Sequence, residues 1–334
     1  MFKNKTILIT GGTGSFGQKF TKTILKKFKP KKIIIFSRDE LKQFDMQENF
    51  KEFKNLRFFL GDVRDKPRLE LAMENVDYVV HAAALKNVPV IEYNPFEAVQ
   101  TNIMGAQNII NTSINFGVKK IIALSTDKAA APINLYGATK LAADKLFISA
   151  NNLIGKRDIR FSVVRYGNVM GSRGSVIPYF MKCKKKGLIP ITDEKMTRFN
   201  ITLEEGVDFV INCFSKMLGG ELFIPKIPSY RIVDIAKAVA PGVKTKIVGI
   251  RPGEKIHEEM ITKSDSLNTI EFKKYFAIIS DSRFGHLSKA DHIKKLKTLG
   301  GKVLKKEFSY SSENNGEFLS VKQLKDLIKK NLPQ

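Results

Sequence analysis

Six short runs of β-branched and other apolar residues recur through the first half of the chain, each separated from the next by a stretch long enough for a helix. The runs are TILIT, KIIIF, RFFLGD, DYVVHAA, KKIIALS and RFSVVRYG, and amphipathic stretches at 94–115 and 134–150 separate the later ones. Strands that are apolar throughout are buried on both faces, and their alternation with helices is typical of a parallel sheet covered on both sides. The sequence therefore predicts an α/β fold built on a Rossmann-type, doubly wound parallel sheet.

The segment TILITGGTGSFGQKF places Gly11, Gly14 and Gly17 between the first predicted strand and the first predicted helix. In that position the first glycine permits a tight turn, the second lets the backbone approach a pyrophosphate, and the third lets the helix pack closely on the strand. The helix N-terminus adds unpaired N–H groups that point toward the phosphates. The spacing predicts a dinucleotide-binding loop that also includes Thr13, Ser15 and Phe16.

The residues after the second predicted strand distinguish two forms of the cofactor. An acidic residue directly at the strand end would bind the ribose 2′-hydroxyl of NAD. Here Ser37 and Arg38 come first and Asp39 opens the next helix, so the sequence favours the 2′-phosphate of NADP. The remaining residues predicted to contact the cofactor follow the second, third and fourth strands and are Glu40, Lys42, Asp62, Val63, Ala82 and Lys86.

The stretch STDKAAAPINLYGATK carries a predicted base for a hydroxyl proton. Tyr136 and Lys140 are four residues apart and lie on one side of a helix. We expect the lysine ammonium to lower the pKa of Tyr136 from its ordinary value of about 10 and to hold the nicotinamide ribose. Thr126 can hydrogen-bond the same substrate hydroxyl. These three residues predict oxidation of an alcohol by hydride transfer to a nicotinamide.

After about residue 167 the pattern loosens into loops rich in Gly, Pro and Arg, such as GSRGSVIP and GIRPGEK. We expect residues 1–166 to form the NADP-binding Rossmann domain with the catalytic residues. Residues 167–334 are expected to form a substrate-binding lobe that is interleaved with the end of that domain.

The composition is that of a soluble globular protein, with 43% hydrophobic and 27% charged residues. The net charge of +24 arises partly from lysine clusters that lack interleaved aromatic residues, so a solvated surface and an anionic substrate are favoured over nucleic acid.

No apolar run approaches the roughly 18 residues of a membrane span, and the chain begins directly with a strand-like segment, so no signal peptide is expected. The cysteines and histidines have no metal-ligand spacing, and His81 is expected to pack at a strand end. A cytoplasmic protein without a metal site is expected.

Several motifs resemble the extended short-chain dehydrogenase/reductase superfamily and, within it, the UDP-N-acetylglucosamine (UDP-GlcNAc) 4,6-dehydratases. They are STDKA, NLYGATK, VRYGNVMGSRGSV, PITDEKMTRF and RPGEKIHEEM, and the resemblance covers nearly the whole chain. The chain is most similar to the inverting branch, which opens pseudaminic acid biosynthesis for flagellin glycosylation. Membrane-bound relatives carry N-terminal transmembrane segments that are absent here, and retaining relatives typically carry methionine at the position of Tyr136.

The resemblance implies that UDP-GlcNAc is oxidised at C4, loses the C5 proton and the C6 hydroxyl, and receives the hydride back at C6. Dehydratases that act on dTDP-glucose typically have an Asp-Glu pair where this chain has Asp127–Lys128. By that match Lys128 is the expected C5 base and Asp127 the acid that assists departure of the C6 oxygen. A lysine base must be partly neutral, which we expect burial and the nearby Lys86 or Lys140 to bring about.

The predicted substrate contacts combine the resemblance with the chemistry of the side chains. Asn168 and the adjoining Val169 have the position from which the family contacts the sugar nucleotide, and Lys86 and Tyr136 are expected to touch the substrate as well. Arg173, Arg198 and Arg251 are predicted ligands of the diphosphate, because guanidinium groups offer bidentate, permanently charged donors. Glu254 is expected to accept from a ribose or uracil group.

Three alternatives remain open from the sequence. A C4-epimerase needs the ketone but no C5 base, so the Asp127–Lys128 pair argues against it. A retaining 4,6-dehydratase would share the site and differ in the configuration of its product. A catalytically silent nucleotide-sensing or nucleic-acid-binding protein would exploit the positive charge without using Thr126, Tyr136 and Lys140. The resemblance also implies a homo-oligomer, namely a hexamer or dimers thereof.

Overall fold

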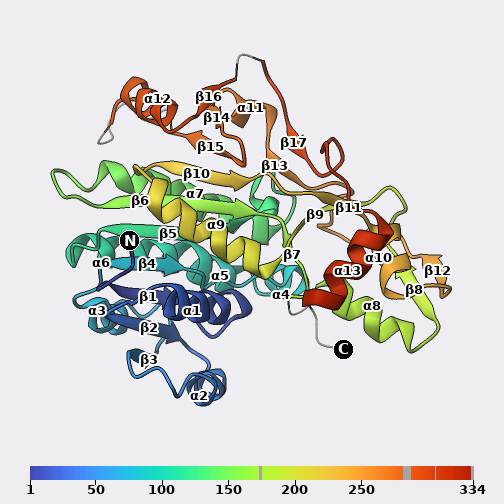
Figure 1. Cartoon of the computed structure of the whole chain (residues 1–334), viewed down its shortest axis with the longest axis horizontal. Coiled ribbons are helices and arrows are strands. Elements are labelled where there is room, and N and C mark those ends of the chain that lie inside the picture. Colours follow the sequence, from blue (N-terminus) through green and yellow to red (C-terminus); the bar gives the residue numbers. More distant parts are fainter. Residues whose placement is uncertain (173–174, 281–286, 305, 332–334) are drawn as a thin grey trace.

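The computed structural model describes residues 1–172, 175–280, 287–304 and 306–331. Within this part of the chain, a 10-stranded sheet has the order β16-β14-β15-β10-β6-β5-β4-β1-β2-β3 (Figure 1). All neighbours from β3 to β10 pair in parallel, whereas β15, β14 and β16 continue the sheet with antiparallel pairs. The predicted Rossmann-type doubly wound sheet is therefore confirmed.

The six predicted apolar runs form the strands at the centre of this sheet. Their bounds are β1 Thr6–Thr10, β2 Lys32–Ser37, β3 Leu56–Leu60, β4 Tyr78–His81, β5 Lys120–Thr126 and β6 Arg160–Tyr166. Every residue of β1 is buried, as expected for a strand covered on both faces. The further strands of the sheet are β10 Glu221–Pro225, β14 Thr269–Glu271, β15 Tyr275–Ile279 and β16 Lys302–Val303.

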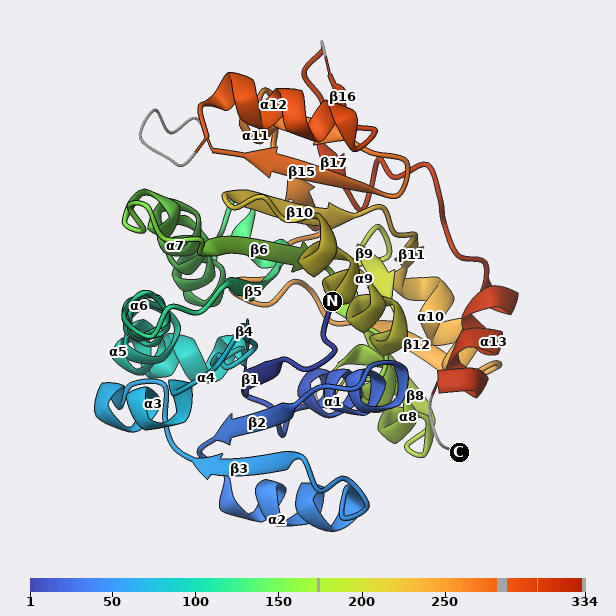
Figure 2. The ribbon, with the colours of Figure 1, turned by 60° about the vertical axis from the view of Figure 1, so that its left-hand side comes forward.

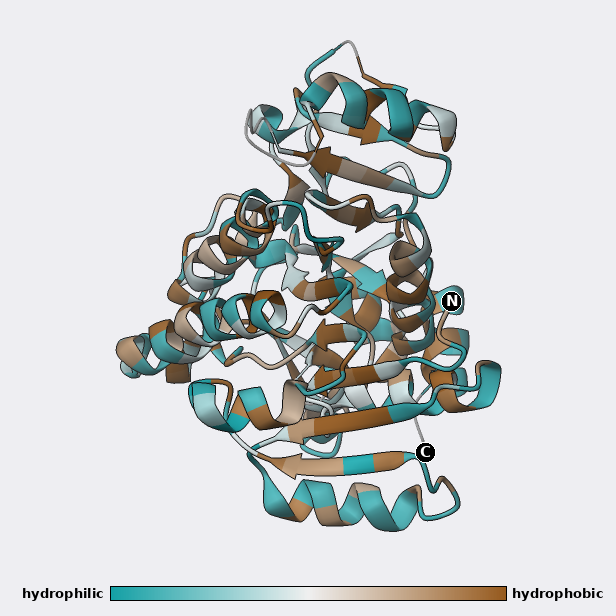
Figure 3. Cartoon of the chain, turned by 90° about the vertical axis from the view of Figure 1, so that its left-hand side faces the viewer, coloured by the Kyte–Doolittle hydropathy of each residue, from teal (hydrophilic) through white to brown (hydrophobic). Residues whose placement is uncertain are grey.

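Helices cover both faces of the sheet. On one face α1 packs beside α9, and on the other α6 lies between α3 and α7 (Figure 2). Coloured by hydropathy, the strands of the sheet are mostly brown and the outer sides of the helices mostly teal (Figure 3). The helices of this part of the fold are α1 Ser15–Lys27, α2 Glu40–Asn49, α3 Lys66–Met73, α4 Val88–Tyr93, α6 Gly105–Asn115, α7 Leu135–Ser149 and α9 Leu203–Lys216.

The predicted helical stretch at 94–115 is divided in the structure. It contains α5 (Pro95–Ala98), a π-helix at Val99–Met104, and then α6. Asn102 lies in the π-helix and is buried, where its side chain accepts from the Leu85 N–H at 2.8 Å and donates to the Leu85 carbonyl at 3.0 Å. The same amide donates to Thr139 Oγ1 of α7 at 3.1 Å. The wide turn thus ties the loop after β4 to the helix that carries Tyr136 and Lys140.

Segments after residue 167 contribute to two regions. Some of them extend the sheet through β10, β14, β15 and β16, and others form a second hydrophobic cluster around Phe180, Ile189, Ile235 and Leu324. The division into a domain at 1–166 and a lobe at 167–334 stays a prediction. The remaining elements are β7 Asn168–Val169, α8 Val176–Lys184, β8 Leu188–Ile191, β9 Thr197–Ile201, β11 Ser229–Arg231, α10 Ile232–Val239, β12 Lys244–Ile247, β13 Glu259–Ile261, α11 Lys263–Ser266, α12 Lys289–Thr298, β17 Tyr310–Ser311 and α13 Val321–Asn331.

Helix α7 approaches the end of β5 very closely. Thr126 ends the strand, and residues Asp127–Ala129 form a single 3₁₀ turn. A Cβ atom on Gly137 would lie 2.1 Å from the Lys128 carbonyl oxygen, so only glycine allows this approach. The glycine therefore sets the distance between the two segments that carry the predicted catalytic side chains.

Replacement of Gly137 by alanine should separate these segments. A backbone carbonyl cannot rotate away as a flexible side chain can, so we expect Gly137→Ala to lower the free energy of unfolding by about 1–3 kcal/mol and to reduce activity. Gly206→Ala is the matched control, because a Cβ on this helical glycine would meet only Ile201 Cδ1 at 3.9 Å. That variant should gain about 0.5–1 kcal/mol. Urea unfolding measures both, and equal effects would contradict the interpretation.

Candidate active site

One large cavity, of about 980 Å³, opens at the carboxyl ends of the parallel strands. This is the edge at which doubly wound sheets bind their ligands. The cavity brings together most of the predicted site residues: Gly11, Thr13, Gly14, Ser15, Phe16, Gly17, Ser37, Arg38, Asp39, Lys42, Asp62, Val63, Ala82, Lys86, Thr126, Asp127, Lys128, Tyr136, Lys140, Asn168, Val169 and Arg251.

The glycine loop forms a cradle made of backbone. Gly11 has a φ of +65°, and a Cβ there would lie 2.9 Å from Ala83 Cα of the neighbouring loop. A Cβ on Gly17 would lie 2.4 Å from the Gly12 carbonyl oxygen. Gly14 is the N-cap of α1 and provides no side-chain cap, so the first N–H groups of the helix remain available at the cavity. This geometry fits a dinucleotide pyrophosphate.

Two carboxylates near the ends of β2 and β3 already have cationic partners. Asp39 caps α2 by accepting from the Lys42 N–H at 3.0 Å, and its carboxylate also contacts the Lys42 ammonium. Asp62 pairs with Arg64 at 2.8 Å and with Arg38 at 3.6 Å. Ser37 Oγ lies 2.8 Å from Thr13 Oγ1 of the glycine loop. Basic and hydroxyl groups therefore line the cavity here together with neutralised carboxylates.

The predicted catalytic side chains meet between β5 and α7. Thr126 Oγ1 donates to Asp127 Oδ1 at 3.0 Å, and the Tyr136 phenol hydrogen-bonds Thr126. Asn134 caps α7 by accepting from the Gly137 N–H at 2.8 Å, and its amide donates to the Gly253 carbonyl at 2.8 Å. The helix that carries Tyr136 and Lys140 is thereby joined to the loop that follows Arg251.

Lys128 is held as an ammonium by two carboxylates. Its Nζ atom lies 3.1 Å from Asp127 Oδ1 and 2.9 Å from Glu258 Oε1. Burial disfavours this charge, but Asp127 and Glu258 outweigh it and raise the pKa of Lys128 above its ordinary value. The expectation that burial with Lys86 or Lys140 leaves Lys128 partly neutral is therefore wrong for this state of the site, because carboxylates surround the amine.

At Asp127, in contrast to Lys128, burial determines the direction of the pKa shift. Its side chain is 1% exposed, and Oδ2 has no hydrogen-bond partner among the described residues. Burial raises the pKa of Asp127 above its ordinary value, although the Lys128 ammonium opposes this shift. A buried carboxyl with a raised pKa, in a residue that lines the cavity, is suited to carry a proton.

Burial also dominates at the predicted tyrosine base. It raises the pKa of Tyr136 to about 12, and the Lys128 ammonium and the Thr126 hydrogen bond only partly oppose it. The expected lowering of this pKa by Lys140 does not appear, since removal of the phenol from solvent outweighs the nearby positive charge. Burial also disfavours the charged form of Lys140 and so lowers its pKa. The carboxylate of Asp144 opposes that shift.

A few predicted residues lie away from the cavity. Arg198 is buried and donates to the backbone carbonyls of residues 197, 255 and 256, so its guanidinium is occupied within the protein. Glu254 accepts from the Arg251 N–H at 3.4 Å, and Glu40 is exposed at the start of α2. Arg173 lies outside the described residues.

The sequence interpretation missed two buried acidic residues. Glu258 contacts Lys128 at 2.9 Å, and it belongs to the motif RPGEKIHEEM, whose spacing gave no sign of this contact. Asp144 pairs with Arg165 at 3.1 Å and accepts from Ser125 Oγ at 2.6 Å. Asp144 is one helical turn beyond Lys140, so the repeat Tyr136, Lys140, Asp144 along α7 was the available signal.

The predicted role of His81 is confirmed. It is buried at the end of β4, where Nδ1 lies 2.8 Å from Thr10 Oγ1, and burial lowers its pKa to about 3. Among the described residues, no group of three or more His, Cys, Asp and Glu side chains could hold a metal ion. In the same part of the chain, none of the helices has the length and apolar character that crossing a membrane requires.

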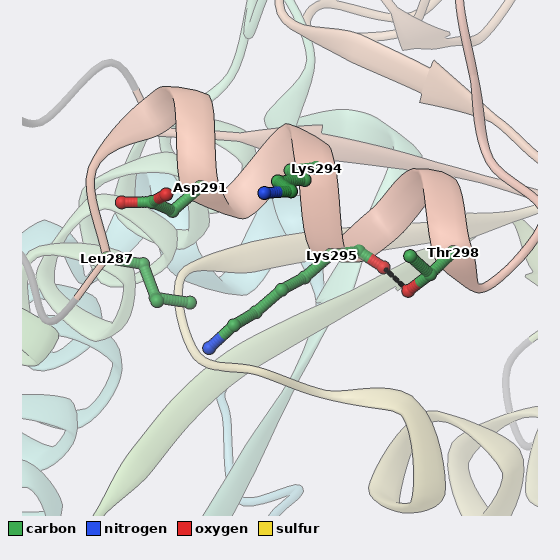
Figure 4. Close-up of a pocket in the computed structure, with 5 residues that line it drawn as sticks. All are labelled: Leu287, Asp291, Lys294, Lys295 and Thr298. Carbon is green, nitrogen blue, oxygen red and sulfur yellow. Dashed lines mark hydrogen bonds between the residues drawn. The ribbon is translucent and has the colours of Figure 1, made fainter.

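A second hollow, of about 330 Å³, lies against α12 (Figure 4). Its lining includes Asp291 and two lysines, and Thr298 Oγ1 donates to the Lys295 carbonyl at 2.7 Å within the helix. Helix α12 precedes β16, the opposite edge of the sheet from the glycine loop (Figure 1). None of the predicted catalytic residues lines this hollow, so the large cavity is the candidate active site.

Comparison with curated proteins identifies relatives along the full chain. The chain is 57% identical over 330 residues to a UDP-N-acetylglucosamine 4,6-dehydratase (inverting) of Campylobacter jejuni, with 98% of each chain covered. It is also 41% identical over 336 residues to a UDP-glucose 4-epimerase of Rickettsia prowazekii, covering 98% of this chain and 96% of that one.

Solved structures agree with the fold. The X-ray structure of Pen from Bacillus thuringiensis has a TM-score of 0.88 and 39% identity, and the match covers 99% of this chain and 98% of that one. A dTDP-glucose 4,6-dehydratase of Streptomyces venezuelae, solved with NAD bound, has a TM-score of 0.69 and 20% identity over 75% of this chain and 86% of that one, which supports the fold alone.

The model of one protein family, described as polysaccharide biosynthesis protein, matches residues 7–280. The chain therefore belongs to the polysaccharide biosynthesis protein family, as a relative of the inverting UDP-N-acetylglucosamine 4,6-dehydratases.

Proposed function

We propose that the protein is an NADP-dependent UDP-GlcNAc 4,6-dehydratase that inverts C5. The observation that carries the proposal is the meeting, in one cavity, of Thr126, Tyr136 and Lys140 with the pair Asp127–Lys128. The first group suits oxidation of a hydroxyl, and the second suits removal of a proton from carbon with loss of water. The 57% identity to the Campylobacter enzyme supports the substrate.

Two features of the cavity support NADP as the cofactor. The backbone cradle of the glycine loop would hold the pyrophosphate, and Ser37, Arg38 and Lys42 would hold the 2′-phosphate. The bound nicotinamide would supply reversible hydride transfer, so that the sugar is oxidised at C4 and reduced at C6 without net redox change. The carboxylates of Asp39, after β2, and of Asp62, after β3, already pair with cations, which favours a phosphate there over a 2′-hydroxyl.

Tyr136 takes the proton of the C4 hydroxyl in the first step. Thr126 orients that hydroxyl, and Lys140 holds the nicotinamide ribose. Because burial keeps Tyr136 protonated in this structure, the phenolate depends on nearby positive charge, and the Lys128 ammonium is one such charge. The resulting C4 ketone acidifies the C5–H bond because the carbanion is an enolate.

The Asp127–Lys128 pair carries out the elimination. Lys128 Nζ lies 3.1 Å from Asp127 Oδ1, so a proton can pass from the ammonium to the carboxylate. The neutral amine then removes the C5 proton, and the Asp127 carboxylic acid gives its proton to the departing C6 oxygen, which leaves as water. Lys128 is then an ammonium and Asp127 a carboxylate again, so the number of protons on the pair is unchanged by the step. Because the two groups exchange a proton, they titrate as a unit.

Inversion requires that C5 receive its new proton on the face opposite to the one that lost it. A single base that returned its own proton would restore the original configuration. Lys128 and Tyr136 are the proposed pair for the two faces.

The remaining parts of the proposal rest mainly on resemblance. We propose a role in pseudaminic acid synthesis for flagellin glycosylation, a cytoplasmic location, and neither nucleic acid nor membrane as a partner. A homo-oligomer, a hexamer by resemblance, is supported by exposed apolar side chains on α4, α5 and the adjoining π-helix, namely Val90, Tyr93, Phe96 and Met104.

The product distinguishes the proposal from its alternatives. In D₂O, UDP-GlcNAc should give a 4-keto-6-deoxy sugar with deuterium at C5 and the L-arabino configuration, without added reductant. Proton NMR during the first turnovers measures both properties. A D-xylo product from its first appearance would indicate a retaining dehydratase. A C4 epimer that keeps its C6 hydroxyl would indicate an epimerase, and either result overturns the proposal.

Removal of the basic side chains at the end of β2 should change the cofactor preference. We expect Arg38→Ala with Lys42→Ala to raise the Kd of NADP by about ten- to a hundred-fold, since charged hydrogen bonds are lost, and to leave the Kd of NAD almost unchanged. Lys51→Ala with Lys54→Ala removes the same charge from exposed positions just after α2 and is the control. Titration calorimetry measures both cofactors, and a parallel loss of NAD and NADP would contradict the assignment.

Loss of the C5 base should separate oxidation from dehydration. Lys128→Met keeps the length of the side chain and leaves Thr126, Tyr136 and Lys140 in place. We expect UDP-GlcNAc to produce the absorbance of the reduced nicotinamide without any 6-deoxy product, and to do so more slowly, because the ammonium that favours the Tyr136 phenolate is lost. Lys145→Met, at an exposed position of α7, should behave as the unmodified protein. Dehydration at the normal rate by Lys128→Met would assign the C5 proton to another residue.

A further inference from the structure

Glu258 enters the active site from a segment that the proposed chemistry does not otherwise use. It lies directly before β13 and is 2% exposed. Its backbone is fixed on both sides by Ser312, because the Glu258 N–H donates to Ser312 Oγ at 2.9 Å and the Ser312 N–H donates to the Glu258 carbonyl at 2.7 Å. The carboxylate is thus held in one position beneath the cavity, and it does not line the cavity itself.

The carboxylate has two cationic neighbours. Glu258 Oε1 lies 2.9 Å from Lys128 Nζ and 3.8 Å from Arg198 Nε. Its second oxygen has no hydrogen-bond partner among the described residues. Burial disfavours the charged form, but Lys128 and Arg198 lower the pKa of Glu258 below its ordinary value, so the group is an anion at neutral pH.

Four charged groups form a balanced set, of which Asp127, Arg198 and Glu258 are buried and the Lys128 side chain is 26% exposed. Arg198 is a permanent cation held by three backbone carbonyls, and Glu258 compensates its charge. The remaining two groups, Asp127 and Lys128, are neutral together whether they are a carboxylate and an ammonium or a carboxylic acid and an amine. A proton can therefore move between them without leaving an uncompensated buried charge, which would be costly.

We propose that Glu258 is a positioning residue of the active site: its carboxylate fixes the Lys128 amine beside Asp127 and, by balancing Arg198, sets the pH range in which the pair works. The inference rests on the proposed function, since it assigns Lys128 and Asp127 their proton transfers. It adds to that function a residue that touches neither substrate nor cofactor.

The surroundings of Lys128 fix the direction of the expected effect. The groups that face it come from its own turn, from β9, from α7, from β11 and from the segment before β13: Asp127, Arg198, Tyr136, Tyr230, Lys255 and Glu258. Removal of the Glu258 charge leaves Arg198 uncompensated, so both protonation steps of the Asp127–Lys128 pair should occur at lower pH.

The test compares the pH dependence of dehydration in matched variants. In Glu258→Gln we expect the bell-shaped profile of kcat to move by about one to two units toward lower pH, with a reduced maximum and a KM for UDP-GlcNAc near the unmodified value. Glu258→Asp keeps the charge but retracts it from Lys128, so its profile should keep its position while kcat falls. Glu259→Gln makes the same chemical change one residue later, at a carboxylate for which the described residues show no ion pair with Lys128 or Arg198, and should change neither.

The outcomes separate this inference from the function on which it rests. A Glu258→Gln profile that superimposes on the unmodified one, with bound cofactor at the same stoichiometry, overturns the positioning role while dehydration by the unmodified protein still supports the proposed function. A lower kcat at every pH without displacement indicates a structural role only and also overturns it. No dehydration by the unmodified protein overturns the proposed function itself.

Discussion

The ion pairs of Lys128 join two segments of the candidate site that are far apart in the sequence. One partner, Asp127, belongs to the turn after β5, and the other, Glu258, belongs to the segment before β13. The same two segments are joined by Asn134 to Gly253 and by Lys255 to the Ala130 carbonyl at 2.7 Å. Since Arg251 begins this segment and lines the cavity, the side of the site proposed to bind the substrate phosphates is fixed to the turn proposed to carry out the chemistry.

Much of the fold was predictable from the sequence because local chemistry and tertiary structure agree there. The six apolar runs could be buried only in a parallel sheet, and the three glycines between strand and helix have a physical reason for each position. The wide turn at Val99–Met104 was not predictable, since it depends on the hydrogen bonds of Asn102 with Leu85 and Thr139 across the fold.

For the candidate site, the sequence predicted which residues line the cavity better than it predicted their protonation states. Residues at strand ends and along one side of α7 could be assigned from spacing, and the cavity contains nearly all of them. The protonation states could not be assigned, because they depend on partners that are distant in sequence. Glu258 lies 130 residues after Lys128, and it turns an amine expected to be partly neutral into a held ammonium. The partners of Arg198 were not predictable from the sequence either. Its guanidinium was expected at the diphosphate, and it donates instead to backbone carbonyls.

The charge arrangement also explains why one fold can serve both of the reactions named among the relatives of this chain. Both an epimerase and a dehydratase need a C4 ketone, which requires only a hydroxyl base and a hydride acceptor. Elimination of water needs, in addition, a base at C5 and an acid at the C6 oxygen, both present at once in a dry site. Asp127 and Lys128 can become that acid and base by exchanging one proton over 3.1 Å, provided that the other buried charges already cancel. In the proposed mechanism Glu258 and Arg198 meet that condition, so we infer that the four-group balance, and not the lysine alone, favours dehydration in this cavity.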